Sequence, residues 1–299
     1  TGLAMPPDRF VGVTDYATAR ATYEADPPVR ILWETGNAPS ALPGSIPGAP
    51  LPRAETRYAA WPIPGVTPTT WYLKSGGRLR PGRSRRTQGS DSYTPDPQAR
   101  PRGDLPSGNV WAANPPYQWT PVVDGASLSY LSNPLPATLS MAGTGRVDLW
   151  VSSTAIDDDV QVTLSEVRAD GTERYIQNGW LRLSHRKLDP TRSTVLNPFH
   201  SDREEDARRM PQGAVVQARV ALFPFAHQFR AGTQIRLTIQ APGGDRPEWT
   251  FAAPSPAGPV TNSIFRTIDH ASRLMLPVLA SGPDLGPDPA PCPSLRAQP

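Results

Sequence analysis

Cysteine, histidine and long apolar runs are scarce in this sequence of 299 residues. The one cysteine, Cys292, has no partner within the chain, which excludes an internal disulfide bond and a metal site built from several cysteines. No apolar run reaches the roughly 18 residues that a membrane-spanning helix needs, so we predict no membrane span. The 30 Lys and Arg residues nearly match the 27 Asp and Glu residues, and the net charge of +3 indicates no particular charged partner.

The sequence also lacks the Gly-x-Ser-x-Gly motif, in which a sharp strand-to-helix turn presents the serine of an α/β-hydrolase. Ser84, in GRSRR, is the nearest serine in a glycine-flanked setting, but it has no second glycine and no preceding strand. We interpret Ser84 as a linker residue. No catalytic nucleophile is therefore predicted in this chain.

The histidines offer few candidates for a general base. His227 lies between apolar residues in FPFAHQF, and we predict a structural histidine near a strand end, because no nucleophile lies near it in sequence. His185, His200 and His270 are predicted to border turns, loops or strand ends. None is assigned a catalytic role.

Proline and glycine are abundant, with 38 and 24 residues, and both disfavour helix interiors. Between residues 127 and 279 about nine short segments of strand length occur, and in the clearest of them apolar and polar residues alternate, as in Val160, Val162 and Leu164 against Gln161 and Thr163. Such a pattern predicts strands with one buried and one solvent-exposed face. The fold class that we predict is mainly β, a two-sheet sandwich of the jelly-roll, galactose-binding-like kind.

The N-terminal part has a different pattern. Residues 14–24 (TDYATARATYE) predict a short helix with a threonine N-cap that ends before Pro27-Pro28, and residues 29–33 (VRILW) predict an apolar strand. Helix, short loop and apolar strand are typical of an α/β sheet. One such unit is too small to be a domain.

Arginine is concentrated in residues 74–90, with five arginines between Arg78 and Arg86. A nucleic-acid or membrane patch is one interpretation. We favour a solvated linker and predict no nucleic-acid partner, because no aromatic residues interleave with the arginines to stack on bases.

Two further segments suggest ligands. Asp157, Asp158 and Asp159 form an acidic run between two strands, which is either a calcium site or an acidic turn. We predict no metal and no cofactor, and the calcium alternative stays open. The aromatic stretch 109–119 (NVWAANPPYQW) could line a pocket, stack on a sugar or pack against a neighbouring domain.

Residues 160–186 (VQVTLSEVRADGTERYIQNGWLRLSHR) and 222–241 (LFPFAHQFRAGTQIRLTIQA), with the closing segment HASRL at 270–274 and Leu276-Pro277, resemble the C-terminal domain of X-Pro dipeptidyl-peptidases and cocaine-esterase-like (CocE/NonD) hydrolases. The match follows the family's order over about two thirds of the chain. In that family the domain is a jelly roll that follows an α/β-hydrolase domain. The resemblance implies that the whole protein is a serine hydrolase acting on peptide, ester or amide acyl bonds.

The resemblance also implies a division of the chain. Residues 1–75 are expected to be the C-terminal remnant of the hydrolase domain, 76–90 an Arg-rich linker, 91–280 the jelly roll and 281–299 a disordered tail. The catalytic serine, acid and histidine are expected in a missing N-terminal hydrolase domain, the main partner of this chain, so that these residues alone are inactive.

By its position in the resemblance, the loop with Val110 and Trp111 is expected to form an apolar wall of the pocket for a small acyl or peptide substrate. A stand-alone carbohydrate-binding or adhesion module is the alternative function, although a helix and strand at residues 14–33 would have no purpose there. The sequence leaves substrate, oligomeric state and compartment open.

Overall fold

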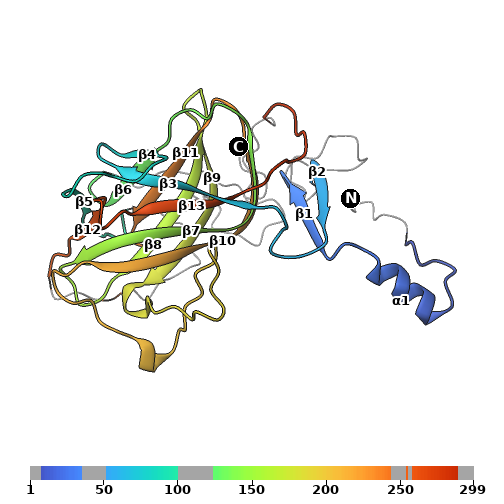
Figure 1. Ribbon diagram of the computed structural model, residues 1–299, viewed down its shortest axis with the longest axis horizontal. Coiled ribbons are helices and arrows are strands. Elements are labelled where there is room, and N and C mark those ends of the chain that lie inside the picture. Colours follow the sequence, from blue (N-terminus) through green and yellow to red (C-terminus); the bar gives the residue numbers. More distant parts are fainter. Residues whose placement is uncertain (1–7, 36–51, 100–123, 244–253, 255–257, 289–299) are drawn as a thin grey trace.

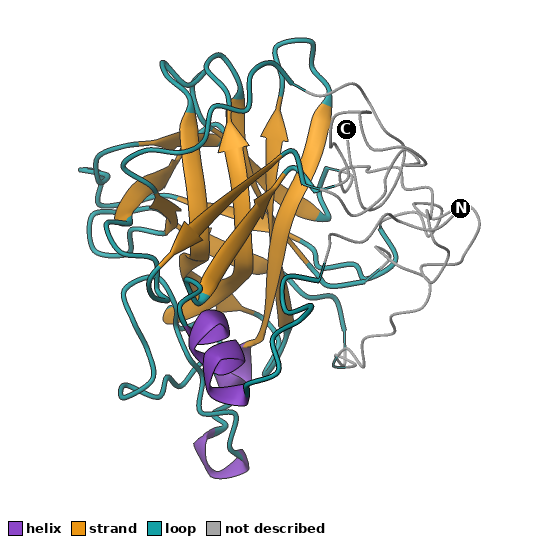
Figure 2. Ribbon diagram, turned by 90° about the vertical axis from the view of Figure 1, so that its right-hand side faces the viewer, coloured by secondary structure: helices purple, strands orange, loops and turns teal. Residues whose placement is uncertain are grey.

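The computed structural model describes residues 8–35, 52–99, 124–243, 254 and 258–288. Within these residues strands predominate, and the few helical segments lie outside the sheet (Figure 2). The helical elements are α1 (Tyr16–Glu24) and two single turns, η1 (Leu183–His185) and η2 (Glu204–Asp206). The strands are β1 (Val29–Trp33), β2 (Ala54–Tyr58), β3 (Thr67–Lys74), β4 (Arg78–Arg80), β5 (Ser90–Tyr93), β6 (Ser127–Leu131), β7 (Leu139–Ser153), β8 (Asp159–Val167), β9 (Glu173–Arg182), β10 (Val216–Phe229), β11 (Gln234–Gln240), β12 (Asn262–Phe265) and β13 (Arg273–Val278).

Eleven of these strands belong to one hydrogen-bonded sheet, in the order β5-β12-β7-β13-β3-β4-β6-β11-β8-β9, with β10 paired to β7. All pairings are antiparallel except the one between β4 and β6, which consists of Arg78 opposite Leu131. This single pair joins the strands around β7 to those around β8. Figure 1 shows the two groups of strands facing each other. The prediction of a mainly β protein is confirmed, and the specific jelly-roll topology stays a prediction.

The main core consists of inward side chains from both groups of strands. Val147, Leu149 and Val151 of β7 contribute from one group, and Val162 and Leu164 of β8 from the other, all fully buried. Alternation places these residues on one face of each strand, which is the face that the sequence predicted. Burial of this apolar surface is the main stabilising contribution to the β body.

Strand β7 is longer than the short segments that the sequence predicted. It runs through Gly143 and Gly145 without a break. Gly143 has a φ of +140°, and a Cβ at Gly145 would lie 2.9 Å from a methyl carbon of Leu222. These glycines are therefore required by backbone conformation and close packing rather than by a turn.

The prediction of one solvent-exposed face per strand is wrong for β7 and β8. Every residue of β8 is buried, including Gln161, Thr163 and Ser165 on the face away from the core. On β7, Asp148 is 1 % exposed because the guanidinium groups of Arg146 and Arg273 surround it, each with Nε 2.8 Å from a carboxylate oxygen. Polar side chains can be buried when they are hydrogen-bonded or ion-paired within the protein. The polar residues of β7 and β8 therefore did not mark a solvent-exposed strand face.

Local predictions held with small corrections. The helix is confirmed, but its N-cap is Asp15 rather than Thr14, because the Asp15 carboxylate accepts hydrogen bonds from the Ala17 and Thr18 amides. The β8–β9 hairpin turns at Gly171, whose φ of +85° suits glycine. No described helix is both long and apolar enough to cross a membrane.

The segments expected to be linker and tail contain ordered contacts. β4 lies inside the expected linker 76–90, and Arg80 donates to the carbonyl of Leu131 at 3.0 Å. β3 pairs with β13 in the large sheet, although residues 67–74 were expected to belong to the hydrolase remnant. Of the expected tail, residues 281–288 are described, and Leu285 is buried. Leu285 therefore contacts the rest of the described chain, and the domain division, tail included, stays a prediction.

Candidate functional site

The N-terminal hairpin is joined to one end of the β body (Figure 1). β1 and β2 form a separate two-stranded antiparallel sheet, with Trp33 opposite Ala54. The Trp33 indole is fully buried and donates to the Thr56 hydroxyl at 2.9 Å. It belongs to a second apolar cluster with Ile63, Ala142, Leu279 and Leu285. Because Ala142 is part of β7, this cluster is continuous with the β body.

A buried carboxylate reinforces this junction. Glu34, directly after β1, is 4 % exposed at its side chain and contacts two guanidinium groups: Arg230 Nη1 at 2.7 Å and Arg53 Nη1 at 3.2 Å. Arg230 also contacts Asp288 at 2.9 Å. Three segments far apart in sequence are thus joined by charge-assisted contacts, and the sequence contained no local signal for them.

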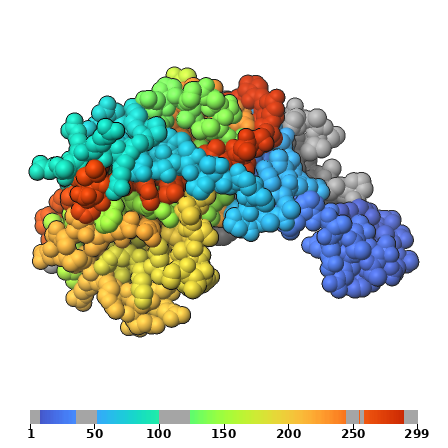
Figure 3. Space-filling model, in the orientation of Figure 1, coloured from blue at the N-terminus to red at the C-terminus, as the bar shows by residue number. Residues whose placement is uncertain are grey.

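Helix α1 differs from the hairpin because none of its residues is buried. Figure 3 shows it projecting from the rest of the molecule. Tyr16 and Tyr23 are 76 % and 67 % exposed, and Val11 before the helix is 79 % exposed. Leu32 on β1 is 43 % exposed. A nine-residue helix is marginal by itself in water, so an apolar surface of this kind normally contacts another part of a protein.

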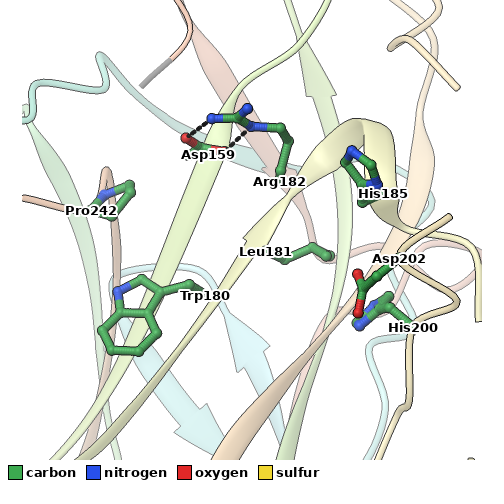
Figure 4. A pocket seen from close by; sticks show the side chains of 8 residues that line it. All are labelled: Asp159, Trp180, Leu181, Arg182, His185, His200, Asp202 and Pro242. Carbon is green, nitrogen blue, oxygen red and sulfur yellow. Dashed lines mark hydrogen bonds and ion pairs between the residues drawn. The ribbon is translucent and has the colours of Figure 1, made fainter. Parts of the chain in front are cut away.

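A cavity of about 470 Å³ lies where β8 begins and β9 ends (Figure 4). Asp159 and Arg182, two of the residues at this cavity, form a bidentate ion pair with both N–O distances 2.9 Å. Its lining residues are Asp159, Trp180, Leu181, Arg182, His185, His200, Asp202 and Pro242. Serine, threonine and cysteine are absent from this described lining, so the cavity presents no hydroxyl or thiol nucleophile.

His200 is a partly buried titratable group of this cavity. Burial lowers its pKa, and the nearby Asp202 carboxylate partly opposes that effect. Its Nε2 is buried and has no hydrogen-bond partner among the described residues. The ring is therefore held mainly in its neutral form.

The three aspartates of the predicted acidic turn have protein partners. Asp157 accepts from the Ser184 amide at 2.9 Å, Asp158 accepts from the Asn262 side chain at 2.6 Å, and Asp159 binds Arg182. Among the described residues no group of three or more His, Cys, Asp and Glu is arranged to hold a metal ion. The carboxylates fix the β7–β8 connection to neighbouring elements.

His227 lies within β10 and is buried, and its Nε2 donates to Glu166 of β8 at 3.1 Å. Burial by itself would raise the pKa of Glu166, but the hydrogen bond and charge of His227 lower it to about 2. The structural interpretation of His227 agrees with this geometry, and the residue lies two positions before the end of β10. His270 packs on Trp150, with ring centroids 4.8 Å apart. Val110 and Trp111, the predicted substrate-pocket wall, lie outside the described residues.

Residues 21–263 match the family described as X-Pro dipeptidyl-peptidase C-terminal non-catalytic domain. The chain belongs to this family. A protein of Mycobacterium bovis named as a serine esterase is 30 % identical over 229 residues, which cover 73 % of this chain and 35 % of the relative. The cocaine esterase of a Rhodococcus strain is 25 % identical over 239 residues, covering 73 % of this chain and 39 % of that enzyme.

Solved structures support the fold of this family member. A CocE/NonD family hydrolase from Staphylococcus aureus superposes with a TM-score of 0.57 at 18 % identity, covering 76 % of this chain and 39 % of that one. The chain thus spans little more than a third of the length of the curated relatives it matches. It represents the non-catalytic C-terminal domain of a family whose members include hydrolases and esterases.

Proposed function

We propose that this chain is the C-terminal, non-catalytic part of a serine hydrolase that cleaves peptide, ester or amide acyl bonds. The match of residues 21–263 to a non-catalytic domain of peptidases carries this proposal. The relatives named as esterases and the short share of their length that the chain spans support it further. The catalytic serine, acid and histidine then belong to an α/β domain outside these residues, where an oxyanion hole would stabilise the acyl-transfer intermediate.

The role proposed for α1 and β1 is to dock that catalytic domain. Tyr16 and Tyr23 of α1, Leu32 of β1 and Val11 before the helix are apolar side chains that stay exposed among the described residues. The family match begins at residue 21, inside α1, so Tyr23 and Leu32 lie near the start of the matched region and Val11 and Tyr16 precede it. The contacts of buried Glu34 with Arg53 and Arg230 would then fix these exposed side chains relative to the β body.

Labelling with a fluorophosphonate probe tests this proposal. The 299-residue chain should remain unlabelled, whereas a longer polypeptide encoded in frame with it should be labelled at one serine. Ser84→Ala is the matched control and should change neither result. Stoichiometric labelling of the chain by itself, abolished in Ser84→Ala, would contradict the proposal.

The second part of the proposal is that Val110 and Trp111 form an apolar wall of the acyl pocket. In the longer enzyme, Trp111→Ala should change kcat/KM ratios between small and large acyl groups by about tenfold, because a pocket wall discriminates by roughly 1–3 kcal/mol. Trp111→Phe keeps an apolar ring and should preserve most of the discrimination. Unchanged kcat/KM ratios in Trp111→Ala would show that this loop does not form a wall of the acyl pocket.

A further inference from the structure

A second cavity, of about 380 Å³, lies beside the β3–β4 hairpin, far in sequence from the features used above. The segment after β4 is held along its edge by two backbone hydrogen bonds: Arg266 N to the Gly89 carbonyl at 3.1 Å and Ile268 N to the Arg86 carbonyl at 2.7 Å. These bonds bring an Arg-rich segment and the end of β12 together. The lining consists of Lys74, Ser75, Arg78, Arg80, Ser84, Arg85, Arg86 and Arg266.

All charged side chains of this lining are cationic. Arg266 is neutralised by Asp91, with N–O distances of 2.8 and 2.9 Å, and Asp91 also accepts from the Tyr130 hydroxyl. The other five cations have no carboxylate within ion-pair distance in the described chain. Asp148, by contrast, lies within ion-pair distance of Arg146 and Arg273. Among the described residues, this lining therefore gathers five cations that have no carboxylate to neutralise them.

The cations are partly preorganised. Arg78 Nε donates to the Ser75 carbonyl at 3.0 Å, and Arg80 Nη1 donates to the carbonyls of Leu79 and Leu131. Each of these guanidinium groups uses one nitrogen in this way and keeps other N–H groups for a ligand. Like charges held close together repel each other, and a bound anion would relieve that repulsion. Burial also lowers the pKa of Lys74, because desolvation disfavours its charged form.

We propose that this cavity binds a multiply charged anion with adjacent phosphate groups. Several guanidinium forks match phosphate oxygens in geometry and charge, whereas one carboxylate would neutralise only one of them. The Ser84 hydroxyl accepts from the Arg86 amide at 3.3 Å, so its own proton is available to a phosphate oxygen. The site is independent of the proposed hydrolase activity.

The ligand chemistry is more specific than general attraction to polyanions. Nucleic-acid sites without sequence preference combine cations with aromatic rings that stack on bases. None of the lining residues is aromatic. The nearby Tyr72 ring has its centroid 5.8 Å from Lys74 Nζ, so this ring faces the lysine. Recognition of phosphate groups therefore fits the lining better than recognition of bases.

Calorimetric titration of the 299-residue chain with inorganic tripolyphosphate tests the site. Arg78→Gln and the double variant Arg85→Gln/Arg86→Gln should each weaken binding by about tenfold or more, as expected for losing charge-assisted hydrogen bonds. Arg83→Gln is the matched control, because Arg83 is exposed in the same segment but does not line the cavity. It should weaken binding by less than about twofold, and far-UV circular dichroism should show all variants folded.

Two further titrations identify the source of the phosphates. Tighter binding to vesicles that contain a phosphoinositide than to phosphatidylserine vesicles of equal charge would identify a lipid headgroup as the ligand. Binding of tripolyphosphate without binding to vesicles would identify a free phosphate compound. Absence of tripolyphosphate binding at about 50 mM salt, where such contacts are strongest, would overturn the proposal. Equal losses in Arg83→Gln and Arg78→Gln, or tighter binding of a single-stranded oligonucleotide than of tripolyphosphate, would overturn it as well.

Discussion

Strand β8 and helix α1 are similar in length and opposite in environment. All nine residues of β8 are buried, on both faces, while none of the nine residues of α1 is buried. β8 is therefore stabilised by contacts within this chain, and α1 has only its Asp15 cap and local pairs such as Arg20 with Glu24. The difference teaches that β8 is stabilised by contacts within this chain, whereas α1 exposes its apolar side chains, as the proposed docking requires.

The largest effect is expected from the core of β8. Leu164→Ala removes a fully buried side chain and should lower the free energy of unfolding by about 2–5 kcal/mol. Denaturant titration followed by tryptophan fluorescence measures this loss. A change below about 1 kcal/mol would show that β8 is not part of the stabilising core, and the contrast with α1 would fail.

A smaller, pH-dependent effect is expected from Glu166. Because His227 holds the folded-state pKa of Glu166 at about 2, below the value of about 4.3 in unfolded chains, the pair stabilises the fold above that unfolded value. This contribution should be lost as pH falls from about 5 towards 2. Glu166→Gln should cost roughly 1–3 kcal/mol at neutral pH, as for the loss of a hydrogen bond to a charged group. Unfolding curves of both proteins across this pH range should converge in acid; parallel curves would contradict the assignment.

Glu34 connects the two regions, and its removal should have an intermediate and local effect. Glu34→Gln keeps the shape but removes the charge that faces Arg53 and Arg230, and Arg230 retains Asp288. We expect a loss of about 1 kcal/mol, because the substituted amide can still accept a hydrogen bond from a guanidinium group. The N-terminal hairpin should be proteolysed faster, with little change in the β body. Arg57→Gln on the exposed side of β2 is a suitable control. Equal proteolysis rates for the two variants would argue against Glu34 as the connection.

The smallest effect is expected in α1. Tyr23→Ala removes an exposed ring and should change the stability of this chain by less than about 0.5 kcal/mol. In the longer protein the same substitution should weaken the docked state, seen as earlier dissociation or unfolding of the catalytic domain. A large loss in the 299-residue chain would show that α1 already packs on the β body.

Much of the β body was predictable because alternation of apolar and polar residues records which strand face is buried. Val160, Val162 and Leu164 were placed correctly in this way, as were the helix and the first strand near the N-terminus. The boundaries of β7 were less predictable, since Gly143 and Gly145 are typical of turns in sequence and lie inside a strand here. The Arg-rich segment was interpreted as a linker. The backbone hydrogen bonds that hold it come from Arg266 and Ile268, about 180 positions later in the chain, and such long-range bonds leave no local sequence pattern.

The sequence by itself determined the β class, the family resemblance and the absence of a Gly-x-Ser-x-Gly motif, because each depends on residues close together along the chain. Only the tertiary structure decided which polar residues are buried and which charges are paired. Asp148 among its arginines, Glu34 between Arg53 and Arg230, and the unpaired cations beside β4 depend on long-range strand pairing. Such contacts join residues through space, and the energy of a charge depends on that environment rather than on its neighbours in sequence.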